Sequence, residues 1–151
     1  MIDVFISCNP PRTGKKNSHG AVAFRSKSSG KTIGRVFKRK EAVKVEQTWL
    51  DLLKAHAPAE PMDGPLQLFL TITFPLNKAD TSTKAKAEKI EVDEWIWHPQ
   101  RPDASNVVEA IQDAMTTLRF FHDDSQVCYL LVRKERGIKP GLNLRLSEVD
   151  S

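Results

Sequence analysis

Apolar and polar positions along the chain alternate in patterns that predict a sheet with helices packed on it. Residues 2–8 (IDVFISC) form a short apolar run before two prolines, which cannot donate to a sheet ladder. Residues 65–74 (PLQLFLTITF) alternate with a period of two, as in a strand with one buried face. That face is predicted to contain Leu66, Leu68, Leu70, Ile72 and Phe74.

Two longer segments show the spacing of amphipathic helices. The first extends from residue 39 to about residue 56 and has one broad apolar face, and Pro58 stops it. The second follows Pro102, and either Asp103 or Ser105 can cap its start. Its core-facing positions recur every three or four residues: Val107, Ile111, Ala114, Met115 and Leu118.

The remaining segments complete a single domain over residues 1–151. Residues 125–136 and 142–149 are predicted to be two strands of a hairpin, and residues 95–97 (WIW) a short strand with one buried face. Residues 9–40 are expected to be a basic, mobile loop with one short strand near residues 21–24. Residues 76–94 are expected to be a polar excursion. We therefore predict an α+β (mixed α/β) fold with a small, mostly antiparallel or mixed sheet and two main helices.

Charge is unevenly distributed along the chain. Residues 1–45 contain eleven Lys and Arg against Asp3 and Glu41, although the net charge of all 151 residues is only +4. A basic first third suggests a polyanionic partner, and the alternative is a solvated loop rich in lysine. The sequence contains neither a membrane-length apolar run nor a signal-peptide pattern. Cys8 and Cys128 lack metal-ligand spacing, so we expect reduced core cysteines in a cytoplasmic protein.

Three aspartates flank the second helix. Asp103 precedes it, and Asp123 and Asp124 follow it. If the chain brings them together, their repulsion would favour a bound cation, and Mg²⁺ prefers such hard oxygen ligands. A bound Mg²⁺ can assist phosphodiester hydrolysis. The alternative is ordinary: a helix cap and two turn residues.

The same region resembles a known family. PDASN at residues 102–106, a helix containing DAM, and HDDSQV at residues 122–127 are similar to the motifs of the RusA family of Holliday junction resolvases. The resemblance is specific over residues 99–133, and the order of the other segments is also similar. It implies a homodimeric α/β nuclease that cuts opposed strands of a four-way DNA junction. It further implies Mg²⁺, with Mn²⁺ as a substitute, and no nucleotide cofactor.

The resemblance also assigns residues. Asp103 and Asp124 match the metal-binding acids, Asp123 is the adjacent acid of the site, and Asn106, Asp113 and Gln126 match further motif positions. Two departures stand out. Ser105 replaces a carboxylate ligand, and Glu109 replaces a lysine that would hold a phosphate or steady developing charge. Ser105 and Glu109 are four residues apart, so they share one face of the helix. One hypothesis is that Glu109 reaches back toward the metal and restores the charge that Ser105 lacks. The alternative is that Glu109 simply faces solvent.

The expected partner is branched DNA. Arg101 and Asn106 lie beside the presumed phosphate site, and the basic first third supplies backbone contacts. These expected contacts are Lys15, Lys16, Arg25, Lys38, Arg39 and Lys40. Three functions remain open at this point: a Mg²⁺-dependent junction endonuclease, a RusA-like protein that binds branched DNA with weak or no cleavage, and an unrelated nucleic-acid-binding protein.

Overall fold

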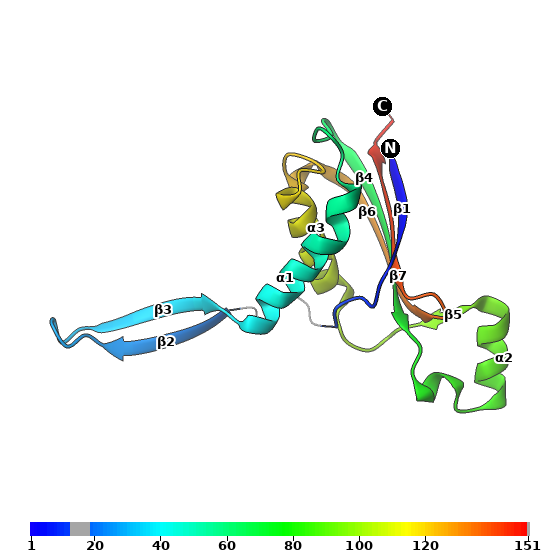
Figure 1. The fold of residues 1–151 in the computed structure, drawn as a ribbon, viewed down its shortest axis with the longest axis horizontal. Coiled ribbons are helices and arrows are strands. Elements are labelled where there is room, and N and C mark those ends of the chain that lie inside the picture. The colour runs from blue at the N-terminus through cyan, green and yellow to red at the C-terminus, as the bar shows by residue number, and fades with distance from the viewer. Residues whose placement is uncertain (13–18, 151) are drawn as a thin grey trace.

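The computed structural model describes residues 1–12 and 19–150, and its centre is a five-stranded mixed sheet (Figure 1). The strand order is β1 (Ile2–Ser7), β7 (Gly141–Glu148), β4 (Leu66–Pro75), β6 (Val127–Gly137) and β5 (Trp95–Trp97). β4 and β6 run parallel, and the other neighbours pair antiparallel. The predicted α+β class and mixed sheet are confirmed.

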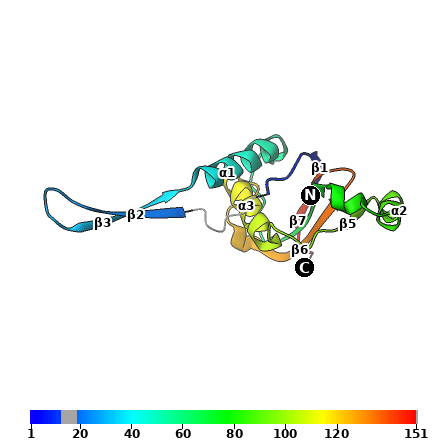
Figure 2. The same cartoon turned by 90° about the horizontal axis from the view of Figure 1, so that it is seen from below.

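The core lies between one face of this sheet and two helices that pack against each other, α1 (Lys40–Leu53) and α3 (Ala104–Thr117) (Figures 1 and 2). A single helical turn, Lys54–His56, extends α1. The predicted inward face of β4 is buried from Leu66 to Phe74. Trp49 of α1 and Ile111 of α3 are also buried against it. Burying an aliphatic side chain stabilises the fold by roughly 1.5–3 kcal/mol, so this layer dominates its stability.

A third helix, α2 (Lys84–Asp93), corrects the expectation of two main helices. It follows a short helical segment, Lys78–Thr81, inside the predicted polar excursion. Ile90 is the buried residue of α2, and the Thr83 side chain accepts a hydrogen bond from the Lys86 N–H at the start of the helix. Because α2 buries so little apolar surface, it has no apolar stripe by which the sequence could reveal it.

The connection at residues 138–140 is also different from the predicted hairpin. β6 and β7 are not neighbours, because β4 lies between them and pairs with both. The short GIKPG segment therefore joins two strands across the end of β4. The strand predicted at residues 142–149 is nevertheless present as β7, and it buries Leu142, Leu144 and Leu146.

The basic first third contains a β-hairpin, formed by β2 (His19–Arg25) and β3 (Thr32–Lys38). Two views show it extending away from the sheet and helices, from the start of α1 (Figures 1 and 2). One short strand was expected here. In β2 the apolar residues form a continuous run at residues 21–24, whereas Ile33, Val36 and Phe37 of β3 follow no period of two, so the sequence gives no clear sign of the second strand.

Both cysteines have free thiols, and their environments differ from the prediction. Cys8 is half-buried, whereas Cys128 on β6 is exposed and is not a core residue. Burial raises the pKa of the Cys8 thiol above its ordinary value. In the part of the chain that is described, no helix has the length and apolar character to cross a membrane.

Candidate functional site

The N-terminal end of α3 presents Asp103. This residue occupies the N-cap position, but its side chain makes no capping hydrogen bond. Instead, the Asn106 side chain donates to the Asp103 carboxylate over 3.4 Å. The carboxylate is exposed, so it remains accessible to a ligand from solvent. Asp103 therefore stands at the start of α3 without capping it through its side chain.

Lys134 of β6 holds the segment that leads into Asp103. Its ammonium group donates to the backbone oxygens of Gln100 and Pro102, and the bond to Pro102 is 2.6 Å long. Partial burial lowers the pKa of Lys134 below its ordinary value, while the nearby Asp103 carboxylate opposes that shift. Lys134 thus fixes the backbone before Asp103 and places a positive charge within electrostatic range of the acid.

Arg136, two residues further along β6, extends this network. Its guanidinium donates to the side-chain oxygen of Gln100 and forms an ion pair with buried Asp80 at 3.1 Å. His98 lies in the same region, with its ring edge-on to Phe74. Burial, with help from the charges of Arg136 and Lys134, lowers the pKa of His98 to about 4. His98 is 6% exposed, which leaves little of it for contact with DNA.

The turn after α3 positions the second group of acids. Phe120 and Phe121 anchor the turn in the core, and a short helical segment, Asp124–Gln126, follows. The Asp123 carboxylate accepts a 2.8 Å hydrogen bond from the Ser125 N–H. Hydrogen bonds from the Ser125 side chain and backbone hold the pKa of Asp123 below its ordinary value. These bonds give Asp123 a role in shaping the turn.

Gln126 ties the same turn to the rest of the fold. Its side-chain oxygen accepts from the N–H groups of His122 and Asp123. Its side-chain nitrogen donates to the backbone oxygens of Met62 and Gly64 over 3.1 and 3.0 Å. These four hydrogen bonds give Gln126 a structural role in this turn. His122 is exposed and pairs with Asp63 at 2.9 Å.

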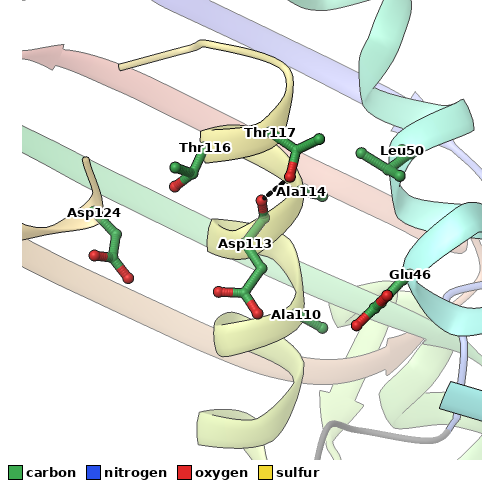
Figure 3. Close-up of a pocket in the computed structure, with 8 residues that line it drawn as sticks. All are labelled: Glu46, Leu50, Ala110, Asp113, Ala114, Thr116, Thr117 and Asp124. Carbon is green, nitrogen blue, oxygen red and sulfur yellow. Dashed lines mark hydrogen bonds between the residues drawn. The ribbon is translucent and has the colours of Figure 1, made fainter. Parts of the chain in front are cut away.

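Asp124 itself lines an open pocket of about 440 Å³ between α1 and α3 (Figure 3). Asp113 of α3 and Glu46 of α1 line the same pocket, so three different elements contribute carboxylates to it. Thr116 and Thr117 form part of the wall, and the Thr117 hydroxyl donates to the Asp113 backbone oxygen over 3.0 Å. Sequence reasoning did not single out Glu46, because it lies far from the motifs on a helix that otherwise reads as a packing element.

The structure does not bring Asp103 and Asp124 together within one chain. Asp124 lines the pocket near the last turns of α3, whereas Asp103 precedes the first turn and is not among the pocket residues. Asp113 is ten residues beyond Asp103, which corresponds to about 15 Å along a helix axis. Binding of one shared ion would need Asp103 and Asp124 to lie close together, and the single chain does not place them so.

The donor chemistry nevertheless suits a hard divalent cation. Carboxylate oxygens are the ligands that Mg²⁺ takes from proteins, and both ends of α3 present them. Among the described residues, however, no three acidic, histidine or cysteine side chains are grouped closely enough to hold a metal ion. The chain thus offers ligands of the right kind in two incomplete sets.

The other predicted residues fall into two regions. Arg101, Ser105 and Glu109 are exposed residues near the N-terminal end of α3. Arg25 and Lys38 belong to the β2–β3 hairpin, and Arg39 and Lys40 lie at the start of α1. Lys15 and Lys16 lie outside the described residues.

Lys134 and Arg136 were missed by sequence reasoning, although a signal existed. Val132, two residues before Lys134, packs against the core, so the period of two places both cations on the helix-covered side of β6. Charged side chains at inward positions of a strand indicate a specific partner. Here that partner is the segment before Asp103.

Comparisons with known proteins show to which family the sequence is similar. The family described as Endodeoxyribonuclease RusA matches residues 19–147. The chain is 38% identical over 97 residues to a protein of Lactococcus phage r1t named Crossover junction endodeoxyribonuclease rusA. It is 31% identical over 97 residues to the uncharacterised protein YqaN of Bacillus subtilis (strain 168). Each match covers 64% of this chain and 66% of the relative, just under two thirds of the relative's length.

Proposed function

We propose that this chain, which belongs to the RusA endodeoxyribonuclease family, is a metal-dependent endonuclease that resolves four-way DNA junctions. The observation that carries the proposal is the position of Asp103. Its carboxylate does not cap α3, it follows a segment that Lys134 holds by hydrogen bonds, and it is within electrostatic range of the Lys134 ammonium. An acid used only to start a helix would need neither arrangement. The name of the phage relative supports the choice of a branched substrate.

The proposed ligands of the metal are Asp103 and Asp124. A bound Mg²⁺, or Mn²⁺ in its place, would supply a water of lowered pKa and neutralise charge at the leaving oxygen. Asn106 orients the Asp103 carboxylate through its side-chain hydrogen bond. Asp123 and Gln126 fix the turn from which Asp124 projects. Arg101, one of the exposed residues before α3, is placed to contact a DNA phosphate.

Lys134 supplies the cation that Glu109 does not. Where the family resemblance leads one to expect a lysine on α3, this chain has Glu109, and the ammonium near Asp103 comes instead from β6. A cation held by backbone oxygens has a fixed position, so it costs little reorganisation when negative charge develops nearby. Glu109 and Ser105 are exposed on the first turns of α3, where they can contribute oxygens to the ion's surroundings.

A homodimer is part of the proposal, because the two acids are separated in one chain. A second copy can bring its Asp124 to the Asp103 of the first without any change of fold. Two-fold symmetry would then create two equivalent sites, one for each strand of a symmetric junction. Mixing the variants Asp103→Asn and Asp124→Asn tests this arrangement. Activity should return in the mixture if each site draws on two chains, and it should stay absent if one chain rearranges to supply both acids.

The function is tested by incubating the protein with a synthetic four-way junction and with a linear duplex, with and without Mg²⁺. Paired nicks in opposed strands of the junction, dependent on Mg²⁺ and lost in Asp103→Asn, are expected. Indifference to branching would contradict the proposal.

A second candidate is a branched-DNA-binding protein with weak or no cleavage. The neutral Ser105 and the acidic Glu109 favour it, since one weakens the ligand set and the other removes a cation from α3. Lys134 favours the nuclease, because it restores a cation beside Asp103. Tight, Mg²⁺-independent junction binding without nicks in the same assay would select this second candidate.

A further inference from the structure

The β2–β3 hairpin presents an apolar face that the rest of the chain does not cover. Directly opposed residues of antiparallel strands share a face, so the pairs Gly20–Phe37, Val22–Arg35 and Phe24–Ile33 lie together. The Phe37 ring lies over Gly20, where an added Cβ would come within 2.6 Å of it. The four large apolar side chains on this face are each 43–49% exposed: Val22, Phe24, Ile33 and Phe37.

This exposure is unusual, because a two-stranded hairpin is marginally stable in water by itself. Among the described residues, β2 and β3 pair with each other and share no extensive contact with another helix or strand (Figures 1 and 2). An apolar face on a projecting, weakly supported element is typical of a surface that is covered when a partner binds.

The charge of the same segment identifies the kind of partner. Residues 19–40 contain no Asp or Glu. Their cations are Arg25, Lys27, Lys31, Arg35, Lys38, Arg39 and Lys40. Arg35 is opposite Val22 on the apolar face itself, and Lys27 lies at the tip of the hairpin. A second copy of the same arm would meet this charge with like charge, which disfavours pairing between arms. The apolar face and the positive charge of the hairpin both suit a polyanion that also offers flat apolar surfaces.

We propose that the β2–β3 hairpin is a DNA-reading arm that inserts Phe24 and Phe37 against exposed bases at the branch point. A two-stranded ribbon has the width of the DNA major groove, and apolar side chains can enter between base steps and unstack them. Base stacking on aromatic rings tolerates any sequence, whereas it requires bases that are already accessible. The arm therefore selects branched over linear DNA, and its cations supply sequence-independent attraction.

The location of the arm connects it with the acids. β3 leads directly into α1, the helix that contributes Glu46 to the pocket with Asp113 and Asp124. A hairpin anchored at the branch point would hold α1 close to the junction. The choice of branched DNA as the partner rests on the proposed function, and the insertion itself rests on the exposed face and the charge.

The test measures binding of the full chain, in EDTA, to a four-way junction and to a linear duplex, each with 2-aminopurine at the central position. The variant Phe24→Ser/Phe37→Ser removes both rings, and Ala21→Ser/Val36→Ser makes matched changes on the opposite face of the hairpin. The wild-type protein should raise the 2-aminopurine fluorescence of the junction. The first variant should bind the junction about tenfold more weakly or worse, with no fluorescence rise, since stacking on two rings is lost.

The same variant should bind linear duplex within about twofold of the wild type, because the phosphate contacts are intact. The opposite-face variant should behave as the wild type does in both assays. A third variant, Phe24→Tyr/Phe37→Tyr, retains two rings and should retain junction preference and fluorescence. Thermal melting of all variants checks that the sheet and helices still fold.

Unchanged junction preference in Phe24→Ser/Phe37→Ser would overturn the proposal, as would an equal loss on junction and duplex. A fall in molecular mass in that variant, with junction binding preserved, would show instead that the arm holds a second copy. A parallel cleavage assay with Mg²⁺ separates the two proposals. A wild-type protein that binds and unstacks the junction without nicking it contradicts the nuclease and supports the arm. A protein that nicks equally well without the two rings contradicts the arm alone.

Discussion

The two ends of α3 carry acids in different surroundings. At the N-terminal end, Asp103 is oriented by Asn106 and follows a segment braced by Lys134 and Arg136. At the C-terminal end, Asp113 and Asp124 face an open pocket that also contains Glu46. One end is a single acid near an ammonium group, and the other is a set of acids from three elements around one pocket.

This difference suggests that the acids at the two ends of α3 have different roles. A segment held by fixed hydrogen bonds keeps its acid in place, whereas acids around an open pocket leave room for an ion and its water molecules. Asp103 would then bring a ligand of fixed position to the proposed ion, and Asp124 would bring one from an open pocket. Each prediction below changes one end and leaves the other intact.

The largest effect should come from the acid that faces the pocket. Asp124→Asn should reduce junction cleavage by about 10³-fold, since it removes a proposed metal ligand. The adjacent Asp123→Asn should cost far less, because Asp123 serves the turn and asparagine can still accept from the Ser125 N–H. Rates of junction nicking in Mg²⁺ compare the two variants. An Asp123→Asn variant that is the more defective of the two would reverse the assignment.

Lys134→Met should reduce cleavage by about 10²-fold, because the segment before Asp103 loses its two anchoring hydrogen bonds and misplacement of a reacting group is costly. The defect should fall on kcat rather than on KM. Lys139→Met, at an exposed position between β6 and β7, is the matched control for loss of one positive charge. Equal activity of the two variants would show that Lys134 does not position Asp103.

Glu109→Gln tests whether this residue compensates for the serine at position 105. If Glu109 contributes charge near the ion, Mg²⁺ affinity should weaken roughly tenfold, as for groups that support metal ligands. Calorimetric titration of Mg²⁺ into the free protein, without DNA, compares Glu109→Gln with the wild type. Unchanged affinity would remove Glu109 from the site.

The last predicted effect is on stability and not on cleavage. The folded chain protonates His98 only near pH 4, whereas the unfolded chain does so near the ordinary pKa of 6.5. The unfolded state therefore binds more protons in this window, and stability should fall as pH drops from 6.5 to 4, by at most about 3 kcal/mol. Urea unfolding across this range should show a shallower dependence for His98→Gln. Parallel curves for the two proteins would rule out a neutral, buried His98.

The strands and helices that pack in the core were predictable, because the spacing of their apolar residues follows directly from which face is buried. β4, α1 and α3 are where the alternation and the three-to-four spacing placed them. α2 was not predictable in this way. Its buried residue is Ile90, so packing against the rest of the chain leaves almost no apolar pattern in its sequence. The order of β6, β4 and β7 was missed for another reason: a short connection suggests a hairpin, and nothing local reveals a third strand between the two.

The sequence allowed the types of residue in the candidate site to be predicted, but much less of their arrangement in space. The motifs around Asp103 and Asp124 indicated the acids and the family. The comparisons confirm the family. Spacing along the chain cannot show that the turn after α3 leaves Asp124 beside Asp113 instead of Asp103. Lys134 is distant from the motif in sequence, and only the parallel pairing of β6 with β4 carries it to the segment before Asp103.

The most direct test of the account maps nicks on a four-way junction in Mg²⁺ for the wild-type protein, Asp103→Asn and Asp124→Asn side by side. The wild-type protein should nick two opposed strands at symmetric positions, and each variant should leave both strands intact. Undiminished paired nicks in either variant would contradict the claim that acids from both ends of α3 act in one reaction.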